Sequence, residues 1–291
     1  MINKKMKGYL LVLSSMLVVS ADSLLVELTQ ADSWNLLFWR GGFMVLSLLA
    51  MLLLRSPIKL VSNVRELTFI SLVAGIAFAI GAIGFVMALN KTTVSSTVTI
   101  FNTAPLFTVL LSFFFLKERI ARSTLIAIAT VVSGVWVIFT FAPNQSLWQG
   151  DLDALVGAIF FSIYLICLSI NKGRHAELIL IIAGICIVIF ALFNGVSPWQ
   201  LSTTQYIYLF LMGGVMLPTA YLLVSKASAL ISAPEVSFIL LGEIFFGPLY
   251  VLVFLGDSPN SSDMVGAAIV LTTLAVHTYW QFKQTEAAPA S

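Results

Sequence analysis

Charged residues and cysteine are both scarce in this sequence. Only 10% of the 291 residues are charged, whereas a soluble domain averages about 25%. Because 59% of the residues are hydrophobic, a water-soluble fold of this length could not bury the apolar surface. The two cysteines, Cys167 and Cys186, lie inside apolar runs, which favours inert packing over a disulfide framework.

The residues that make metal centres and nucleophilic sites are also few. Cys167, Cys186, His175 and His277 are scattered along the chain, so neither a metal cluster nor a nucleophile with its base is predicted. The glycine pairs lie within apolar runs and have no phosphate-binding lysine after them. The net charge of +2 gives no sign of a nucleic-acid partner. An enzyme is therefore not expected, and no cofactor is predicted.

What the sequence does contain is a series of apolar runs of about twenty residues, each long enough to cross a bilayer core of about 30 Å as a helix. No run shows the sustained alternation of a strand. The pattern predicts an all-α integral membrane protein with ten transmembrane helices. The expected helices cover residues 8–29, 33–54, 67–89, 93–116, 122–142, 151–171, 175–195, 204–226, 229–254 and 263–282.

The cations are distributed unevenly among the connections between these helices. If the connections alternate between two sides, thirteen of the fifteen Lys and Arg residues fall on one side. The exceptions are Lys91 and Arg40, and the opposite connections carry Asp32, Asp151 and Asp153. The positive-inside rule makes the cationic side cytoplasmic, with both termini on it, in a bacterial-type inner membrane.

The N-terminus allows a second interpretation. Lys4, Lys5 and Lys7 precede an apolar region, and Val19-Ser20-Ala21 resembles a signal-peptidase site, so cleavage there would leave nine helices. A repeat within the chain favours retention of the first helix.

That repeat is visible when the segment from Ala104 to Val137 is placed over the segment from Glu243 to Val276. It divides the chain into two halves of five helices, residues 1–143 and 144–283, followed by a tail, 284–291, that is expected to be disordered. Because five is odd, equivalent helices must cross the membrane in opposite directions. Inverted repeats of this kind place a substrate site at their interface near mid-membrane and allow alternating access.

Several motifs make the sequence resemble the drug/metabolite transporter superfamily, specifically its ten-helix EamA-type members. They are Phe38-Trp39-Arg40, Ala88-Leu89, Ala104-Pro105-Leu106-Phe107, Leu116-Lys117-Glu118-Arg119, Leu241-Gly242-Glu243, Phe254-Leu255-Gly256-Asp257 and Gly266-Ala267-Ala268. The family usually has Pro after the intramembrane Glu, where this chain has Ile244, so Pro234 and Pro248 are expected to supply kinks instead. The resemblance implies transport of amino acids, bases, toxic analogues or other metabolites.

Three ionisable residues are predicted deep within helices. Asp22, Arg40 and Glu243 each lie about 10 Å below the non-cytoplasmic face, which would allow an ionic cluster. Arg40 is either neutralised by one of the acids or left partly free to hold a substrate carboxylate. A buried ion pair that only joins two helices is the competing interpretation. Glu27 and Glu235 lie nearer to helix ends and are expected to reach water.

Polar and aromatic residues at mid-depth complete the predicted site. Asn102, Tyr164 and Tyr221 would line a cavity, with Phe78 as a stacking surface. Asp22, Glu243 or His277 would take up a proton if transport is proton-coupled.

The sequence therefore predicts a carrier that exports small amphiphilic metabolites, such as amino acids, by alternating access. An uptake carrier driven by protons or by exchange stays open, and a channel is the more distant alternative. The expected partners are a small solute and the lipid bilayer.

Overall fold

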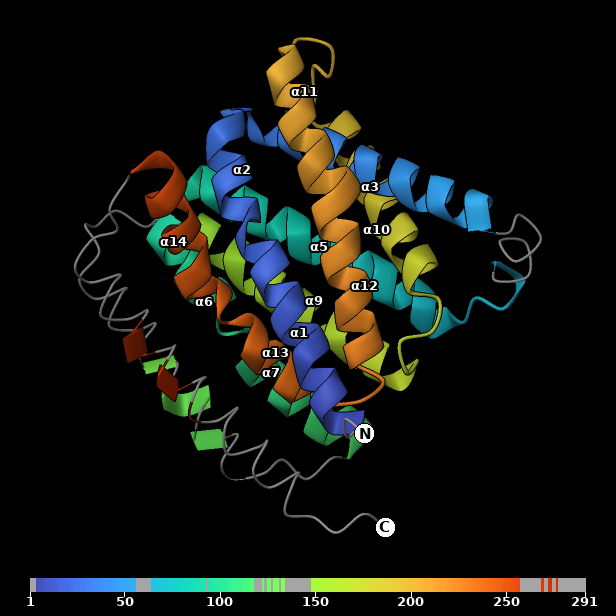
Figure 1. Cartoon of the computed structure of the whole chain (residues 1–291), viewed down its shortest axis with the longest axis vertical. Helices are drawn as coiled ribbons and strands as arrows, with labels where there is room; N and C mark the ends of the chain where they lie inside the picture. The colour runs from blue at the N-terminus through green and yellow to red at the C-terminus, as the bar shows by residue number, and fades with distance from the viewer. Residues whose placement is uncertain are drawn as a thin grey trace.

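The computed structural model describes residues 4–55, 64–92, 94–117 and 148–256, with isolated positions between 122 and 133 and between 268 and 276. Throughout these residues the regular secondary structure is helical (Figure 1). The helices form one bundle. Apolar side chains pack in its interior, and further apolar side chains cover its outer surface. An exterior of exposed Leu, Ile and Phe suits a protein whose solvent is lipid.

Seven of the described helical segments are long and apolar enough to cross a membrane, and a shorter apolar helix spans Ala104–Leu116. Together with α6, that shorter helix fills an eighth predicted span. The elements are α1 (Lys4–Ser20), α2 (Asp22–Thr29), α3 (Ser33–Arg55), α5 (Phe69–Lys91), α6 (Val94–Phe101), α7 (Ala104–Leu111), η1 (Ser112–Leu116), α9 (Trp148–Ile170), α10 (Ala176–Phe193), α11 (Thr203–Phe210), η2 (Leu211–Met216), α12 (Leu217–Ala227), α13 (Ala233–Leu240) and α14 (Glu243–Leu255).

Eight of the ten predicted spans thus coincide with described helices, with ends that differ by a few residues. The predicted helices at 122–142 and 263–282, together with His277 and the tail, lie outside the described residues apart from isolated positions.

Successive spans run in opposite directions, as contacts between their ends show. At the Thr29 end of the bundle, Ser33 bonds to Asn90 and Lys91 pairs with Asp153 at 2.7 Å. At the opposite end, the Lys4 end, Asn171 bonds to Ser71. The pair with Asp153 gives Lys91, the one cation predicted in a connection on the less basic side, a local partner.

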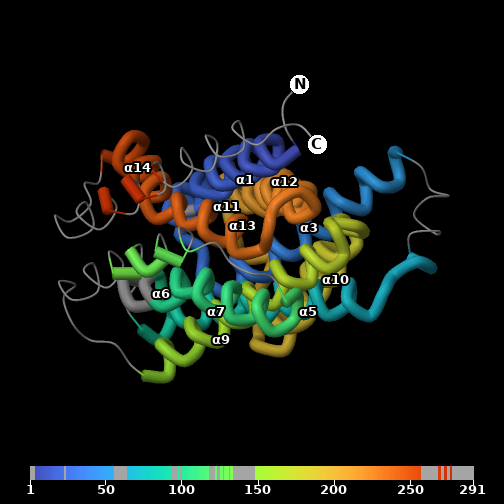
Figure 2. Tube along the Cα trace, turned by 90° about the horizontal axis from the view of Figure 1, so that it is seen from below, coloured from blue at the N-terminus to red at the C-terminus, as the bar shows by residue number. Residues whose placement is uncertain are grey.

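The bundle has two main layers, which Figure 2 shows from below. One layer contains α1, α12, α13 and α14, and the other contains α5, α6, α7 and α9. α3 and α10 pack against each other beside them. Close packing between α5 and α9 depends on Gly84, where an added Cβ would lie 2.8 Å from the Asp153 carbonyl oxygen.

Three spans are interrupted in their interior, which the sequence analysis did not predict. The first breaks at Ala21, between α1 and α2, and the fourth at Asn102 and Thr103, between α6 and α7. The span formed by α13 and α14 breaks at Leu241 and Gly242. Pro234 lies in the first turn of α13 and Pro248 inside α14, so the interruption falls at neither of the prolines expected to bend this span.

The break at Gly242 lies against α1. A Cβ on Gly242 would lie 2.6 Å from the Met16 sulfur, so the Met16 side chain packs directly on this point. The break at Asn102 is stabilised locally, because the Asn102 side chain donates to the Val98 carbonyl at 2.7 Å. Pro105, in the first turn of α7, cannot donate a backbone hydrogen bond across the break.

Candidate functional site

A cavity of about 580 Å³ lies inside the bundle, lined by residues of both layers. It begins at mid-depth, where Phe78 and Tyr221 line it, and extends to Glu27 near the Thr29 end. Glu27 is exposed, so the cavity reaches the surface on this side. Toward the Lys4 end, buried Tyr9, Leu168 and Val224 fill the interior instead.

An ion pair between Asp22 and Arg40 lies in the cavity wall. The Arg40 Nη2 donates to Asp22 Oδ2 at 2.5 Å, and the side chains are 21% exposed for Arg40 and 11% for Asp22. Asp22 is the first residue of α2, directly after the break at Ala21. The other oxygen, Oδ1, is buried without a hydrogen-bond partner among the described residues.

Close helix packing fixes the position of Arg40. Gly213, in the π-helical turn η2, lies directly against the Arg40 backbone, and a Cβ there would overlap the Arg40 carbonyl oxygen. The side chain is therefore presented from a rigid segment of α3 and not from a loop.

Glu243 is the third charged residue in the cavity wall. It is the first residue of α14, immediately after the break at Gly242, and it is partly exposed to the cavity. The charges of Asp22 and Arg40 both act on it, although no described residue bonds to its carboxylate. The helix dipole favours an acid at this position. The Glu243 carboxylate thus borders the cavity with no hydrogen bond from a described residue.

Aromatic rings make up much of the remaining wall. Phe78, Phe85, Phe101, Phe161 and Tyr221 all line the cavity. They form a continuous chain of edge-to-face and tilted contacts, with ring centroids 4.9 Å apart for Phe85 and Phe101, 5.7 Å for Phe101 and Phe161, and 4.6 Å for Phe78 and Tyr221. A planar solute would find ring surfaces on α5, α6 and α9 and charges on α2, α3 and α14.

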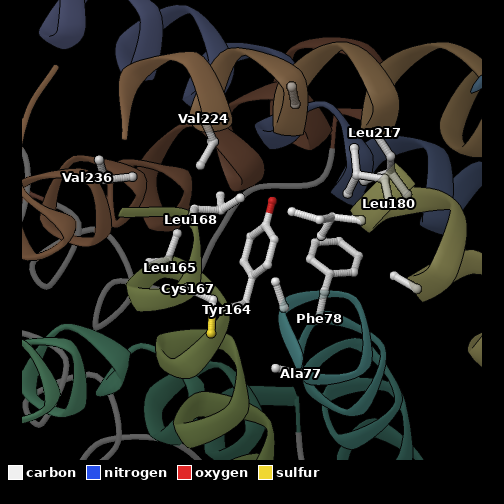
Figure 3. Close-up of a cluster of buried hydrophobic side chains, with 14 of the residues drawn as sticks. Ala77, Phe78, Tyr164, Leu165, Cys167, Leu168, Leu180, Leu217, Val224 and Val236 are labelled. Carbon is white, nitrogen blue, oxygen red and sulfur yellow. The ribbon is translucent and has the colours of Figure 1, made fainter. Parts of the chain in front are cut away.

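Tyr164 differs from the other predicted site residues, because it does not line this cavity. It is 1% exposed and packs edge-to-face against Phe78 with 4.9 Å between centroids. Figure 3 shows its ring extending from α9 toward Val224 on α12, beside Phe78. Tyr164 therefore supports the cavity floor from below.

The structure brings together most of the residues singled out from the sequence. Asp22, Arg40, Asn102, Tyr221 and Glu243 all line the same cavity, and Phe78 joins them. Asn102 contributes from the end of α6, although its amide nitrogen is already bonded to the helix. Glu27 is exposed, as expected, and lies at the cavity mouth, whereas Glu235 is 8% exposed and bonded to Tyr9 at the Lys4 end, where it borders a second pocket.

Sequence reasoning missed Phe85, Phe101, Phe161 and Ser237, which also line the cavity. With 22 phenylalanines in the chain, composition does not separate the cavity-lining rings from those that face lipid. The signal that was available for Phe101 is its position directly before the Asn-Thr-Ala-Pro break.

The fold and the site define a polytopic helical membrane protein with a central polar and aromatic cavity. Residues 6–140 match the family model described as the EamA-like transporter family, which confirms the resemblance predicted from the sequence. The first half of the chain is therefore similar to EamA-like transporters, and the long apolar helices among the described residues suit a multi-pass membrane protein.

Two curated relatives are transporters by name. The chain is 28% identical over 192 residues to a riboflavin transporter of Vibrio cholerae, an alignment that covers 62% of this chain and 61% of that protein. It thus spans less than two thirds of that relative's length. The chain is also 22% identical over 293 residues to an uncharacterized transporter of Clostridium kluyveri, with 91% of each chain covered.

A solved crystal structure shares the fold. It superposes with a TM-score of 0.80 at 16% sequence identity, covering 95% of this chain and 98% of the other.

Proposed function

We propose that the protein carries a small amphiphilic metabolite across a bacterial inner membrane by alternating access, with Asp22, Arg40, Asn102, Tyr221 and Glu243 as its binding residues. The observation that carries this proposal is the cavity itself: it combines an ion pair, a carboxylate to which no described residue bonds, and five aromatic rings near the middle of the bundle. It opens toward one end while buried side chains fill the other. Tyr164 acts behind this site by holding Phe78.

Two halves related by inversion, residues 1–143 and 144–283, would supply the second conformation. In support, α7 begins at Ala104 and α14 begins at Glu243, the two positions that the repeat places in register. These helices also run toward opposite ends of the bundle. Interrupted helices at corresponding positions of two inverted halves mark the binding site in many secondary carriers.

The chemistry of the cavity narrows the class of solute. Charged groups of both signs favour a molecule with hydrogen-bonding or ionic groups, and the aromatic chain favours a flat apolar portion. Riboflavin, named in one relative, has both features, as do aromatic amino acids and nucleobases. Carrying such a solute requires no catalytic chemistry from the protein.

The orientation of the bundle in the membrane is inferred from the distribution of its cations. The Lys4 end carries most of the described cations outside the bundle interior, so we place it in the cytoplasm. The cavity then faces outward, which fits release by an exporter. Uptake in the same geometry is the alternative, and Asp22 or Glu243 would carry a coupled proton in either direction. His277, the third proposed proton carrier, lies outside the described residues.

Counterflow in proteoliposomes tests the proposal. Vesicles loaded with unlabelled riboflavin, an aromatic amino acid or a nucleobase should accumulate the same labelled compound, with saturation, for at least one of the three. The Glu243→Gln variant should lose at least nine tenths of this rate, because the amide cannot supply the charge. Glu66→Gln, at an exposed position away from the cavity, is the matched control and should retain the rate.

Two results would contradict the proposal. Undiminished counterflow in a correctly folded Glu243→Gln variant would remove this residue from the site. Flux that neither saturates nor shows counterflow would mean a channel, because a channel has no binding site that is exposed alternately to the two sides of the membrane.

A further inference from the structure

A second hollow lies at the Lys4 end, on the other side of α13 from the central cavity. This vestibule of about 490 Å³ is lined by residues that include Lys5, Lys172, Ser232 and Glu235. Lys172 lies in the turn that follows α9 and is not buried, so the vestibule opens at the surface. Ser237, two residues after Glu235 on the same short helix, lines the central cavity instead. α13 therefore separates the two spaces.

A hydrogen-bonded cluster joins α13 to α1 at this partition. Glu235 Oε1 accepts a hydrogen bond from the Tyr9 hydroxyl at 2.6 Å and lies 3.2 Å from the Lys5 ammonium. Glu235 Oε2 accepts from the backbone N–H and the hydroxyl of Ser232, at 3.0 and 2.9 Å. One oxygen thus caps its own helix, while the other holds α1.

We propose that Lys5, Tyr9 and Glu235 form a latch that closes the pathway between the vestibule and the central cavity, and that the vestibule is where solute meets the carrier at the Lys4 end. This inference rests on the proposed alternating access. Opening would separate α1 from α13 and break both contacts to Oε1, while the two Ser232 bonds keep α13 intact.

The position of the latch makes it strong yet reversible. Tyr9 is 1% exposed and Glu235 is 8% exposed, so their bond is shielded from water and charge-assisted. When the bond breaks, however, the carboxylate already borders the vestibule, where water can solvate it. The other described ion pair at this end, Arg55 with Glu177, is 4.0 Å long, and Arg55 is 70% exposed, so it contributes little to closure.

Thiol accessibility in two reporters tests the latch. In a background with Cys167 and Cys186 replaced by Ala, one reporter carries Ser237→Cys, beyond the latch, and the other Val26→Cys, in the wall of the central cavity on α2. A membrane-impermeant maleimide is applied to the Lys4 side for the first and to the Thr29 side for the second.

Tyr9→Phe keeps the ring and removes the bond to Glu235. It should raise the modification rate of the Ser237→Cys reporter about tenfold, equivalent to about 1.4 kcal/mol, and lower the rate of the Val26→Cys reporter. Glu235→Gln should act in the same direction, whereas Glu177→Gln, which removes an acid at the same end, is the matched control and should change neither rate.

The outcomes separate the latch from the carrier. If Tyr9→Phe leaves both rates unchanged while the parent protein still shows counterflow, the latch is wrong and the carrier stands. If the rate of the Ser237→Cys reporter rises without any fall for the Val26→Cys reporter, the cluster seals the pathway but access does not alternate, which overturns the proposed function. A rise in the rate of the Ser237→Cys reporter together with a fall in the rate of the Val26→Cys reporter supports both the latch and the carrier.

Discussion

The ion pair between Asp22 and Arg40 contributes to helix packing, but packing alone does not account for its geometry. A partner removed from a buried pair leaves a charge without compensation, so the pair stabilises the packing of α2 against α3. Asp22 Oδ1 nevertheless has no partner among the described residues, and an unsatisfied buried oxygen costs about 1–3 kcal/mol. A pair kept for stability alone would satisfy both oxygens.

A double-mutant cycle measures how much the pair contributes to stability. Asp22→Asn and Arg40→Gln should each lower the free energy of unfolding by about 3 kcal/mol, because each leaves one buried charge unpaired. The double variant should lose clearly less than the sum of the two. Unfolding by SDS in mixed micelles, followed through tryptophan emission, gives the three values. Strictly additive losses would mean that the two side chains do not interact.

At the same scale, the sequence identified the charged site residues but not the aromatic ones. Asp22, Arg40 and Glu243 stand out because an ionisable residue within an apolar helix is costly and rare. Phe85 and Phe161 carry no such signal, because Phe occurs equally against lipid, in the core and in a cavity wall. Their role becomes visible once the helix faces are known.

At the scale of helices, length and hydropathy were sufficient to predict eight spans to within a few residues. The positions of the interior breaks were not predicted, because hydropathy and length are the same on both sides of each break. Gly242 is one of 18 glycines, and nothing in its neighbours along the chain shows that Met16 packs against it. Helix register within the membrane is likewise set by packing between helices.

Packing of α5 against α9 gives a prediction at this scale. Gly84→Ala would place a Cβ 3.0 Å from the Gly157 Cα, in addition to its approach to the Asp153 carbonyl oxygen. Backbone atoms cannot move aside as a side chain can, so we expect a loss of about 1–3 kcal/mol in stability.

The control for this prediction is Gly42→Ala, where the nearest atom to the new Cβ is a Val188 methyl at 3.9 Å. It should leave the midpoint of thermal unfolding in detergent nearly unchanged, while Gly84→Ala lowers it by several degrees. Equal midpoints for the two variants would contradict the close approach of α5 and α9.

At the scale of the whole molecule, the alternation of cations along the sequence agrees with the alternation of helix direction in the bundle. Contacts such as Lys91 with Asp153 and Asn171 with Ser71 sort the helix ends into two sets. The side of the membrane that each set faces follows from charge and not from geometry. It is therefore a separate prediction.

Cysteine labelling in intact cells tests this prediction. In the cysteine-free background, Ser197→Cys at the Thr29 end should react with an impermeant maleimide added outside. Lys172→Cys at the Lys4 end should react only after the membrane is permeabilised. Both positions are outside the membrane-spanning helices and at least partly exposed. The reverse pattern would invert the molecule and, with it, the outward-facing cavity.

The separation of charges and rings within the cavity has a consequence for recognition. Charges come from α2, α3 and α14, while most of the rings come from α5, α6 and α9. A bound molecule must therefore direct its ionic groups toward one set of helices and its flat face toward the other. These two demands set the orientation in which a bound molecule lies, so a compound that lacks either the ionic group or the flat face should be transported more slowly.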